Sequence, residues 1–448
     1  MSGIIFSIRD LCWNPLLLAA FFGVGLYFSI KSGFLQLRRP VYIFRSTFGN
    51  IKKADTKDGI SPFAALSAAL AACMGTGNII GVASALTLGG PGAVFWMVVS
   101  ALLGEMTSCA ENILGIEYRA KNEKNEWMGG SLLYIEKAFG RKTACVFSVF
   151  CAGAALGMGN MTQANAISTA VCEQTETLPV ALGVAVAAVV GMVIFGGVKR
   201  VSGVTEKIIP PLSLAVIIAL LAVIIKNYTF IVPCIKQIFV SAFGFGSLSA
   251  GVGSYTLSKA LKEGFARGVF SNEAGLGSSP LVHASADVRE PLEQGLWGIA
   301  EVFIDTVLMC TLTALALMTS GAYGNSTPLS PVQMSVAAFS DIFGNSSGVF
   351  VCVALCLFAF ATIIGWGFYG EKAVEYAFGE KAITPYRLVF LICTVIGTCA
   401  SLDTVWALSD IFNALMAIPN LAAIVVLRKK AVYHIKKISP ENSRLICD

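Results

Sequence analysis

Long apolar stretches without charged residues constrain the fold of this chain more than any other feature. Several of them exceed the ~20 residues that a helix needs to cross a bilayer. Hydrophobic residues make up 56% of the 448 positions and charged residues only 13%, whereas a soluble domain carries about 25% charged residues. That leaves too little polar sequence to cover the apolar surface in water. We therefore expect an all-α protein that lies in a lipid bilayer.

Hydropathy predicts about eleven membrane-spanning helices. Their approximate ranges are 12–30, 61–89, 91–116, 144–170, 178–197, 208–226, 263–286, 296–320, 347–369, 387–402 and 405–427. The first apolar run, from Trp13 to Ile30, ends without a small-residue cleavage site, so we expect a retained span rather than a signal peptide.

The lysine and arginine residues indicate how the spans are oriented. If the chain crosses the membrane eleven times, most of the 32 basic residues fall in connections on one side. The connections on the opposite side contain few basic residues. The basic connections are 31–58, 118–143, 198–207, 287–295, 370–387 and 428–448. Positive charge marks the cytoplasmic side, so we expect a cell-membrane protein with its N-terminus outside and its C-terminus in the cytoplasm.

Two of the predicted spans carry polar, glycine-rich interruptions at a comparable depth. The second contains "ACMGTGNIIG" at 72–81, and the seventh contains "FSNEAGLGSS" at 270–279. Unwound backbone survives in hydrocarbon only where it is buried in protein or faces a watery cavity. If the first span is set aside, each broken helix begins a group of five spans, and the two groups have opposite orientations. Broken helices at matching positions of inverted halves indicate the binding site of a carrier.

This arrangement divides the chain into five segments. They are an extra N-terminal span with a basic loop (1–58), a first five-helix repeat (59–226), an extracellular loop or hairpin (227–262), a second five-helix repeat (263–427) and a basic cytoplasmic tail (428–448). The segment 227–262 is assigned to the outside although it holds three lysines, and Pro233 and several glycines interrupt it.

The polar groups at the two breaks suit a zwitterion together with a monovalent cation. Free amide groups in "GTGN" at 75–78 suit a carboxylate, because the positive end of a half-helix dipole points at the same place. Freed carbonyls and side-chain oxygens suit a hard cation. The side-chain oxygens belong to Asn78, Ser271, Asn272 and Thr362.

Acidic residues within the spans are costly and usually functional. We assign function to Glu273, inside the second break, and to Asp305, which shares a helix face with Glu301. The alternative to a functional role is that these acids form buried structural ion pairs, for instance with Arg267 or Lys259. Structural roles are favoured for Glu105, Glu111 and Glu301.

Three further polar or aromatic residues within the spans are candidates for the pocket. Thr362 and Trp366 lie one turn apart, so Trp366 would close the pocket over a small side chain while Thr362 serves as a ligand. The alternative for Trp366 is a place in the interfacial aromatic belt. Gln163 is either a pocket residue or a contact between helices.

Other classes of function find little support. The 13 cysteines are scattered, no CxxC occurs, and only two histidines are present, which argues against a disulfide framework or a zinc site. No HExxH, GxSxG or paired aspartate motif indicates an enzyme. The net charge of +5 lies in loops and does not indicate nucleic acid. A channel would need a continuous polar lining, whereas the polar residues here cluster at two breaks.

Several motifs resemble the alanine or glycine:cation symporter family. They include "GTGNIIGVASALTLGGPGAVFWMVVSALLGEMTSCAE", "GMGNMTQANAIS", "RGVFSNEAGLGSSPLVHASA", "EVFIDTVLMCTLTAL" and "FAFATIIGWGFYGEKAVEY". They are spread over most of the chain from Ser61 to Leu427. The resemblance implies a LeuT-type 5+5 inverted-repeat fold preceded by one extra helix. It also implies sodium-coupled symport of alanine, glycine or a near relative into the cell by alternating access.

The resemblance also implies roles for individual residues. The substrate site would comprise Gly75, Thr76, Gly77, Asn78, Gln163, Ser271, Asn272, Glu273, Gly275, Thr362 and Trp366. One sodium ion would lie between the carbonyls of Ala71 and Met74 and the oxygens near Thr362, and a second would involve Asn78 and Asp305.

The remaining implications concern partners and alternatives. Sodium is the expected coupling ion, no organic cofactor is expected, and the oligomeric state stays open. A proton-coupled carrier and a carrier of glutamine or serine are the alternatives. The chain departs from the family in "GGSLLYIEKAFG" at 129–140 and at Gly367, where a serine is common.

Overall fold

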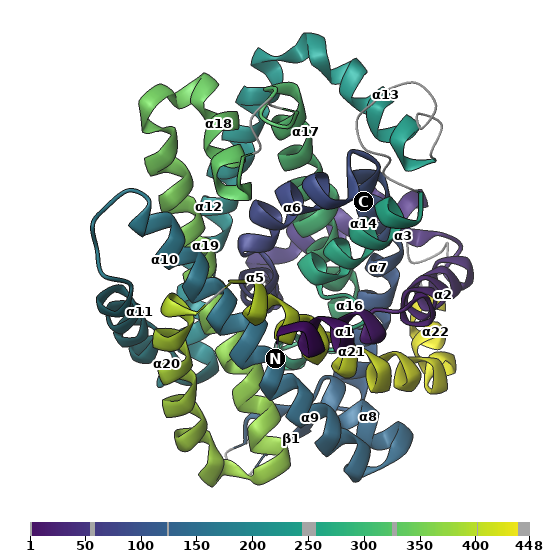
Figure 1. Cartoon of the computed structure of the whole chain (residues 1–448). Helices are drawn as coiled ribbons and strands as arrows, with labels where there is room; N and C mark the ends of the chain where they lie inside the picture. Colours follow the sequence, from purple (N-terminus) through teal and green to yellow (C-terminus); the bar gives the residue numbers. More distant parts are fainter. Residues whose placement is uncertain are drawn as a thin grey trace.

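The computed structural model describes residues 2–53, 59–122, 125–243, 257–324, 329–400 and 402–437. The described chain is almost entirely helical (Figure 1). Two short antiparallel strands, β1 (Ala120–Lys121) and β2 (Trp127–Met128), form the one sheet in these ranges. The prediction of an all-α protein is confirmed.

The N-terminal part contains the predicted extra span. Its elements are α1 (Ser2–Cys12), α2 (Pro15–Lys31), α3 (Leu35–Arg38), α4 (Pro40–Thr47) and the 3-10 turn η1 (Phe48–Lys53). Asn14 caps α2 by accepting a hydrogen bond from the amide of Leu17, and Pro15 occupies the first turn, where its missing N–H is harmless. The helix α2 packs against α7.

The first group of predicted spans begins with a broken helix. Its elements are α5 (Pro62–Cys73), η2 (Thr76–Asn78), α6 (Ile80–Gly89), α7 (Gly92–Glu117), α8 (Ser131–Phe139), α9 (Arg141–Leu156), the π-helical η3 (Gly157–Met161), α10 (Thr162–Cys172), α11 (Pro179–Ile194) and α12 (Gly197–Lys226).

The second group also begins with a broken helix. Its elements, after η4 (Tyr228–Phe230) and α13 (Ile231–Ala242), are α14 (Leu257–Asn272), α15 (Pro280–His283), α16 (Pro291–Val302), the π-helical η5 (Phe303–Cys310), α17 (Thr311–Thr319), α18 (Pro331–Phe343), η6 (Gly344–Ser346), α19 (Ser347–Phe378), η7 (Glu380–Ala382), α20 (Ile383–Cys399), α21 (Leu402–Val426) and α22 (Arg428–Lys436).

Every predicted span coincides with helix, but several boundaries differ. In the described ranges seven helices are long and apolar enough to cross a membrane, and five shorter apolar helices accompany them. Two of the shorter ones, α5 and α6, are the halves of the broken second span. The number of spans, the five-segment division and the inverted repeat stay predictions.

Three connections are more structured than hydropathy indicated. The predicted outer loop 227–262 holds α13 and the start of α14. The connection 321–346 holds α18, which begins with Pro331 and a capping box between Ser330 and Gln333. The basic connection 118–143 holds α8 and both strands. These elements are too short or too polar to register as spans.

The core around the breaks is built from small residues. The alanine-rich helix α5 is buried along most of its length and packs against α12 and α19. A Cβ added at Gly365 of α19 would lie 3.0 Å from the Cβ of Ala72. Small residues thus let two helices approach closely, as is common inside membranes.

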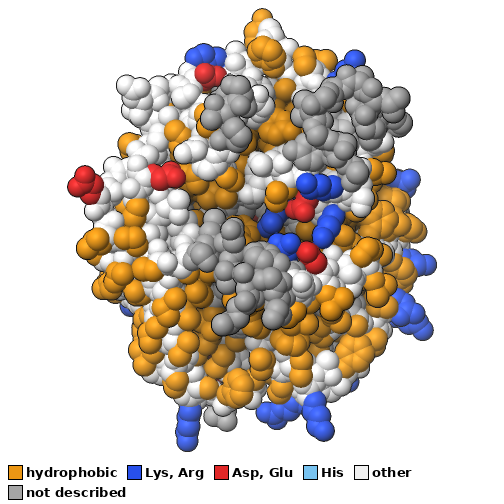
Figure 2. Space-filling view, in the orientation of Figure 1, with side chains coloured by type: hydrophobic (Ala, Val, Ile, Leu, Met, Phe, Trp, Pro, Cys, Tyr) orange, Lys and Arg blue, Asp and Glu red, His pale blue; other side chains and the backbone are white. Residues whose placement is uncertain are grey.

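The surface of the molecule agrees with a place in lipid. Hydrophobic side chains cover much of the flanks in Figure 2. Lysine and arginine side chains project at the lower edge, where Figure 1 places α8 and the connection between α19 and α20. This is the end that the sequence assigns to the cytoplasm.

Candidate ion and substrate site at two broken helices

The first break separates α5 from α6. The helix α5 ends at Cys73, and the extended backbone at Gly75 (φ −121°, ψ −144°) leads into the turn η2. A Cβ on Gly75 would lie 2.6 Å from Oγ1 of Thr362 and 3.0 Å from Oε1 of Gln163. Glycine at this position therefore allows two polar side chains to reach the unwound backbone.

Both of these side chains engage the break. Thr362 Oγ1 donates to the carbonyl oxygen of Ala71 at 2.9 Å. The Oε1 atom of Gln163 accepts from the amide of Thr76 at 3.3 Å. Gln163 thus contacts the unwound backbone and connects two helices at once, as both interpretations of it required.

The second break follows α14 and depends on left-handed backbone. Glu273 (φ 57°), Gly275 (φ 91°) and Gly277 (φ 77°) all adopt positive φ. Glycine reaches this region without strain, and glutamate does so rarely. The helix does not resume until α15, so several amides of residues 273–279 lie outside regular helix in the interior of the protein.

A carboxylate from α7 satisfies two of these amides. Glu111 accepts from the amides of Gly275 and Gly277 at 3.1 Å each and from Nδ2 of Asn420 at 2.6 Å. Tyr134 donates in turn to Oδ1 of Asn420 at 2.5 Å. The structural role favoured for Glu111 is consistent with these contacts, but the sequence did not indicate that Glu111 holds the break itself. An acidic residue deep in a neighbouring span was the one available signal.

The two breaks meet at Asp305. Asn78 Nδ2 donates to Oδ1 of Asp305 at 2.7 Å, and Oγ of Ser271 donates to its Oδ2 at 2.7 Å. Asn78 Nδ2 also lies 3.4 Å from Oγ of Ser271. Thr306 adds a further donor at 2.6 Å. The predicted meeting of the segments 75–78 and 271–277 is therefore present in the structure.

Asp305 is fully buried, and its hydrogen-bond partners among the described residues are neutral. None of the described ion pairs includes it, so the suggested pairing with Arg267 is wrong. The guanidinium of Arg267 lies instead 5.1 Å from the ring of Trp406.

A π-helical segment sets the position of Asp305. The segment η5 (Phe303–Cys310) interrupts the α-helical geometry on which the shared face of Glu301 and Asp305 was predicted. Glu301 contacts Ser279 at 2.7 Å and His283 at 3.0 Å, so the two acids have different partners. Single turns of π-helix are rare and occur often at functional sites. Neither η5 nor η3 was predicted from the sequence.

Trp366 closes the side of the second break. Its Nε1 donates to Oε1 of Glu273 at 2.9 Å, and Ser278 donates to Oε2 at 2.5 Å. Trp366 is fully buried and packs against Gly159, so the alternative of an interfacial belt residue is wrong. Glu273 is likewise bound to neutral donors.

Three further predicted site residues, Asn272, Met74 and Gly77, also lie at the breaks. Asn272 is buried, and its Oδ1 accepts from the amide of Ala274 at 3.0 Å, so it stabilises its own break. The thioether of Met74 lies against Oγ of Ser213. Gly77 lies beside Ser271 and Phe270, where an added Cβ would meet both at 3.8 Å.

Two buried oxygens of the first break have no hydrogen-bond partner. They are Oγ1 of Thr76 and Oδ1 of Asn78. Buried polar groups are nearly always satisfied, so an unpartnered pair calls for an explanation. Oxygens of this kind next to a carboxylate are the ligands that a hard cation takes. The described residues contain no group of three or more His, Cys, Asp or Glu that could hold a transition metal.

A cavity of about 400 Å³ leads towards the first break. It reaches Thr76 and passes Thr162 and Asn165 of α10 and Trp406 of α21. Its other walls include Glu173 and Ser330, which lie at the end that the sequence assigns to the outside. The site is thus reached from one end of the molecule.

Broken helices that meet around a buried carboxylate are the arrangement found in secondary transporters. Comparison with known proteins gives the family. The model of the sodium:alanine symporter family matches residues 1–444. The chain is 38% identical over 450 residues to the sodium/alanine symporter AgcS of Methanococcus maripaludis, covering 98% of each protein. It is 36% identical over 423 residues to the probable sodium/glutamine symporter GlnT of Bacillus subtilis, covering 94% of this chain and 87% of the relative.

A solved structure shares the fold. The substrate-bound, outward-open state of a Na⁺-coupled sialic acid symporter matches 88% of this chain and 82% of its own with a TM-score of 0.54 at 11% identity. This likeness concerns the fold alone. The chain belongs to the sodium:alanine symporter family, whose members are membrane transporters and not enzymes.

Proposed function

We propose that this protein carries a small neutral amino acid, alanine or glycine, into the cell together with sodium by alternating access. The proposal is supported by the family and by the relative AgcS, which is described as a sodium/alanine symporter. In this proposal the N-terminus lies outside and the C-terminus in the cytoplasm.

One observation carries the sodium part of the proposal. Asp305 is buried among neutral donors, one of which is Asn78 of the first break, and Oγ1 of Thr76 and Oδ1 of Asn78 in that break have no partner. A buried carboxylate without a cation is costly, and a monovalent cation among these oxygens would remove that cost. Ala71, Met74 and Thr362 are proposed to form the other sodium site.

The substrate is proposed to lie along the two breaks. The amides of residues 75–78 would bind its carboxylate, and Glu273 would face its ammonium group. Ser271, Asn272 and Gly275 would contribute from the second break. Trp366, which donates to Glu273, and Gln163, which accepts from Thr76, would line this space, and the proposal is that they leave room for a small side chain and not for that of glutamine.

Coupling would follow from groups that ion and substrate share. A ligand shifts a conformational equilibrium only through differential affinity for its states. Asn78 belongs to the break that would hold the carboxylate and also contacts Asp305, so occupation of one site would stabilise the geometry of the other. The cavity that reaches Thr76 would be the outer entrance.

The test is uptake into proteoliposomes that contain the purified protein. Labelled alanine should accumulate when sodium is outside and choline inside, and unlabelled glycine should compete more strongly than glutamine. Counter-exchange and saturation are expected of a carrier and not of a channel. Accumulation driven equally by a pH gradient in choline would instead support the proton-coupled alternative and contradict the proposal.

A further inference from the structure

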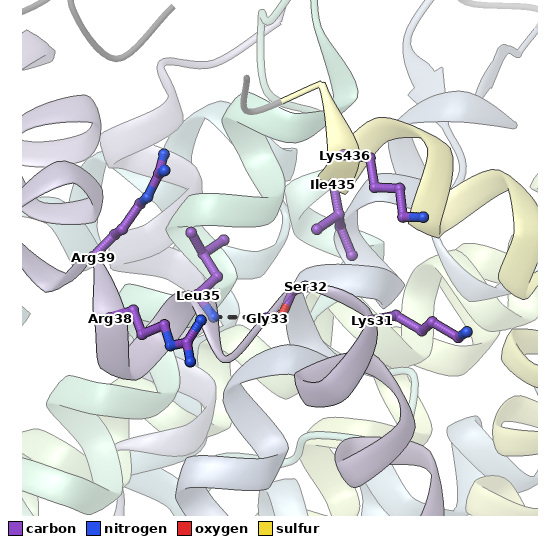
Figure 3. A pocket seen from close by; sticks show the side chains of 8 residues that line it. All are labelled: Lys31, Ser32, Gly33, Leu35, Arg38, Arg39, Ile435 and Lys436. Atoms are coloured by element: carbon purple, nitrogen blue, oxygen red, sulfur yellow. Dashed lines mark hydrogen bonds between the residues drawn. The ribbon is translucent and has the colours of Figure 1, made fainter. Parts of the chain in front are cut away.

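A basic pocket lies where the turn after α2 meets the C-terminal helix α22. Its volume is about 280 Å³. Four cationic side chains line it, with Arg38 and Arg39 on one side and Lys31 and Lys436 on the other (Figure 3). The turn between them contains Gly33, where an added Cβ would meet nothing within 4 Å. The pocket therefore combines a high positive charge with open space.

The described residues place no acidic side chain in an ion pair with the cations of this pocket, which are Lys31, Arg38, Arg39 and Lys436. The Nη1 atom of Arg39 is buried without a hydrogen-bond partner. A buried cationic donor without an acceptor is destabilising, so an anion at this place would stabilise the fold.

Three other basic residues in α22 or at its C-terminal end are paired with acids. Lys430 lies 2.7 Å and His434 2.9 Å from the carboxylate of Glu117, and Lys437 lies 3.2 Å from that of Glu290. Acidic partners were thus available to this helix, and they pair with the residues outside the pocket. Lys436, which lines the pocket, is in none of the ion pairs of the described residues.

Exposed apolar side chains lie on or next to the elements that carry the cations of the pocket. Leu37, Val41 and Phe44 of α3 and α4 are more than half exposed, as is Ile30 at the end of α2. Tyr433 of α22 is also 58% exposed, and tyrosine is typical of the membrane–water interface. A ligand for this place therefore has an anionic head beside an apolar part.

We propose that the pocket binds the phosphate of an anionic phospholipid whose acyl chains lie along the apolar side chains of α3 and α4. A phosphate offers several acceptor oxygens to two guanidinium groups and two ammonium groups at once. The pocket lies at the end that the sequence assigns to the cytoplasm, where basic pockets between helices bind anionic lipid. Free phosphate shares the head-group chemistry but cannot contact the apolar side chains. The bound lipid would hold α22 against the turn after α2.

Native mass spectrometry of the full chain in neutral detergent tests this proposal. Phosphatidylglycerol is expected to stay bound to the wild type in preference to phosphatidylcholine. Each cation near a membrane surface contributes about fivefold to the attraction of anionic lipid. We therefore expect the variant Arg38→Gln/Arg39→Gln/Lys436→Gln to retain at least about tenfold less phosphatidylglycerol.

A matched control removes three charges elsewhere at the same predicted end. The variant Lys142→Gln/Lys199→Gln/Lys381→Gln changes exposed residues outside the pocket and should retain phosphatidylglycerol like the wild type. The single variant Lys436→Gln, also at an exposed position, covers the case in which the triple variant fails to fold, and it should lose retention several-fold.

Thermal unfolding separates the two sources of phosphate. Phosphatidylglycerol is expected to raise the Tm of the wild type and not that of the pocket variants, while inorganic phosphate and glycerol phosphate at millimolar concentration have little effect. Equal lipid retention by the wild type and by Lys436→Gln and the triple variant would overturn the proposal. Stabilisation by inorganic phosphate equal to that by the lipid would overturn it as well.

Discussion

The side-chain amide of Asn78 has one end bound and one end free. Its Nδ2 donates to Asp305, whereas its Oδ1 is buried without a partner. The hydroxyl of Thr362 donates a hydrogen bond to the carbonyl oxygen of Ala71. The two residues therefore mark the two proposed ion sites.

We expect Asn78→Ala and Thr362→Ala each to lower sodium-dependent uptake of alanine by at least about tenfold. Hydrogen bonds to charged groups contribute about 1.5–3 kcal/mol, which corresponds to that factor. Uptake by proteoliposomes at several sodium concentrations is the measurement, with size-exclusion chromatography to confirm insertion. Thr319→Ala is the control, because Thr319 donates only to Leu315 in its own helix. Uptake at the wild-type level in both variants would place the ion sites elsewhere.

Gly159 is required by the close approach of Trp366. A Cβ at position 159 would lie 2.1 Å from the Cβ of Trp366, and no real contact is that short. Gly159→Ala should therefore destabilise the protein by about 1–3 kcal/mol, the usual cost of overpacking, and displace Trp366 from Glu273. Thermal unfolding and uptake measure the two effects.

Gly81→Ala is the matched control, since an added Cβ there meets nothing within 4 Å. Gly81→Ala should leave the stability of the protein unchanged or raise it slightly, because alanine has a higher helix propensity than glycine. Equal Tm values for the two variants would show that Trp366 does not need this glycine.

At the scale of elements, the second break depends on a carboxylate from another helix. Glu111 of α7 accepts from two amides of the break, and Glu111→Gln would replace one acceptor oxygen by a donor facing an N–H group. We expect a loss of about 2–3 kcal/mol in stability and a large loss of uptake. Thermal unfolding in detergent and uptake measurements check this.

Glu105→Gln is the control on the same helix. Glu105 is also buried, but its Oε1 has no hydrogen-bond partner, so the change removes no described contact with a break. If Glu105→Gln reduced stability and uptake as much as Glu111→Gln does, the effect would come from burial of the charge and not from the break.

The breaks themselves could be predicted because glycine and short polar residues interrupt apolar runs. That the two segments meet could also be predicted, since polar groups in lipid have no other way to be satisfied. The π-helical segments η3 and η5 could not be predicted, because residue composition does not distinguish a π-helical turn from an α-helical one. The role of Glu111 depends on backbone amides 164 and 166 residues away, and the sequence does not show which amides a carboxylate will face.

At the scale of the whole molecule, the distribution of basic residues predicts the sidedness of the protein. The described structure places α22 and the turn after α2 side by side, and both are basic, as a common cytoplasmic face requires. Dual reporters test this orientation, with green fluorescent protein active only in the cytoplasm and alkaline phosphatase active only outside. We expect fluorescence from fusions after Gly379 and at the C-terminus, and phosphatase activity from a fusion after Asn227.

The fusion after Asn227 also tests whether α13 crosses the membrane. Asn227 follows α12 and precedes α13, which carries one of the three lysines that make 227–262 the exception in the charge pattern. If α13 crossed the membrane, every later connection would change sides, and the fusion after Gly379 would be phosphatase-active instead. Phosphatase activity at 227 together with fluorescence at 379 requires an odd number of crossings between them. That result would leave α13 at the outer surface and keep the basic pocket and α22 in the cytoplasm, whereas the same reporter active at both positions would contradict the predicted order of spans.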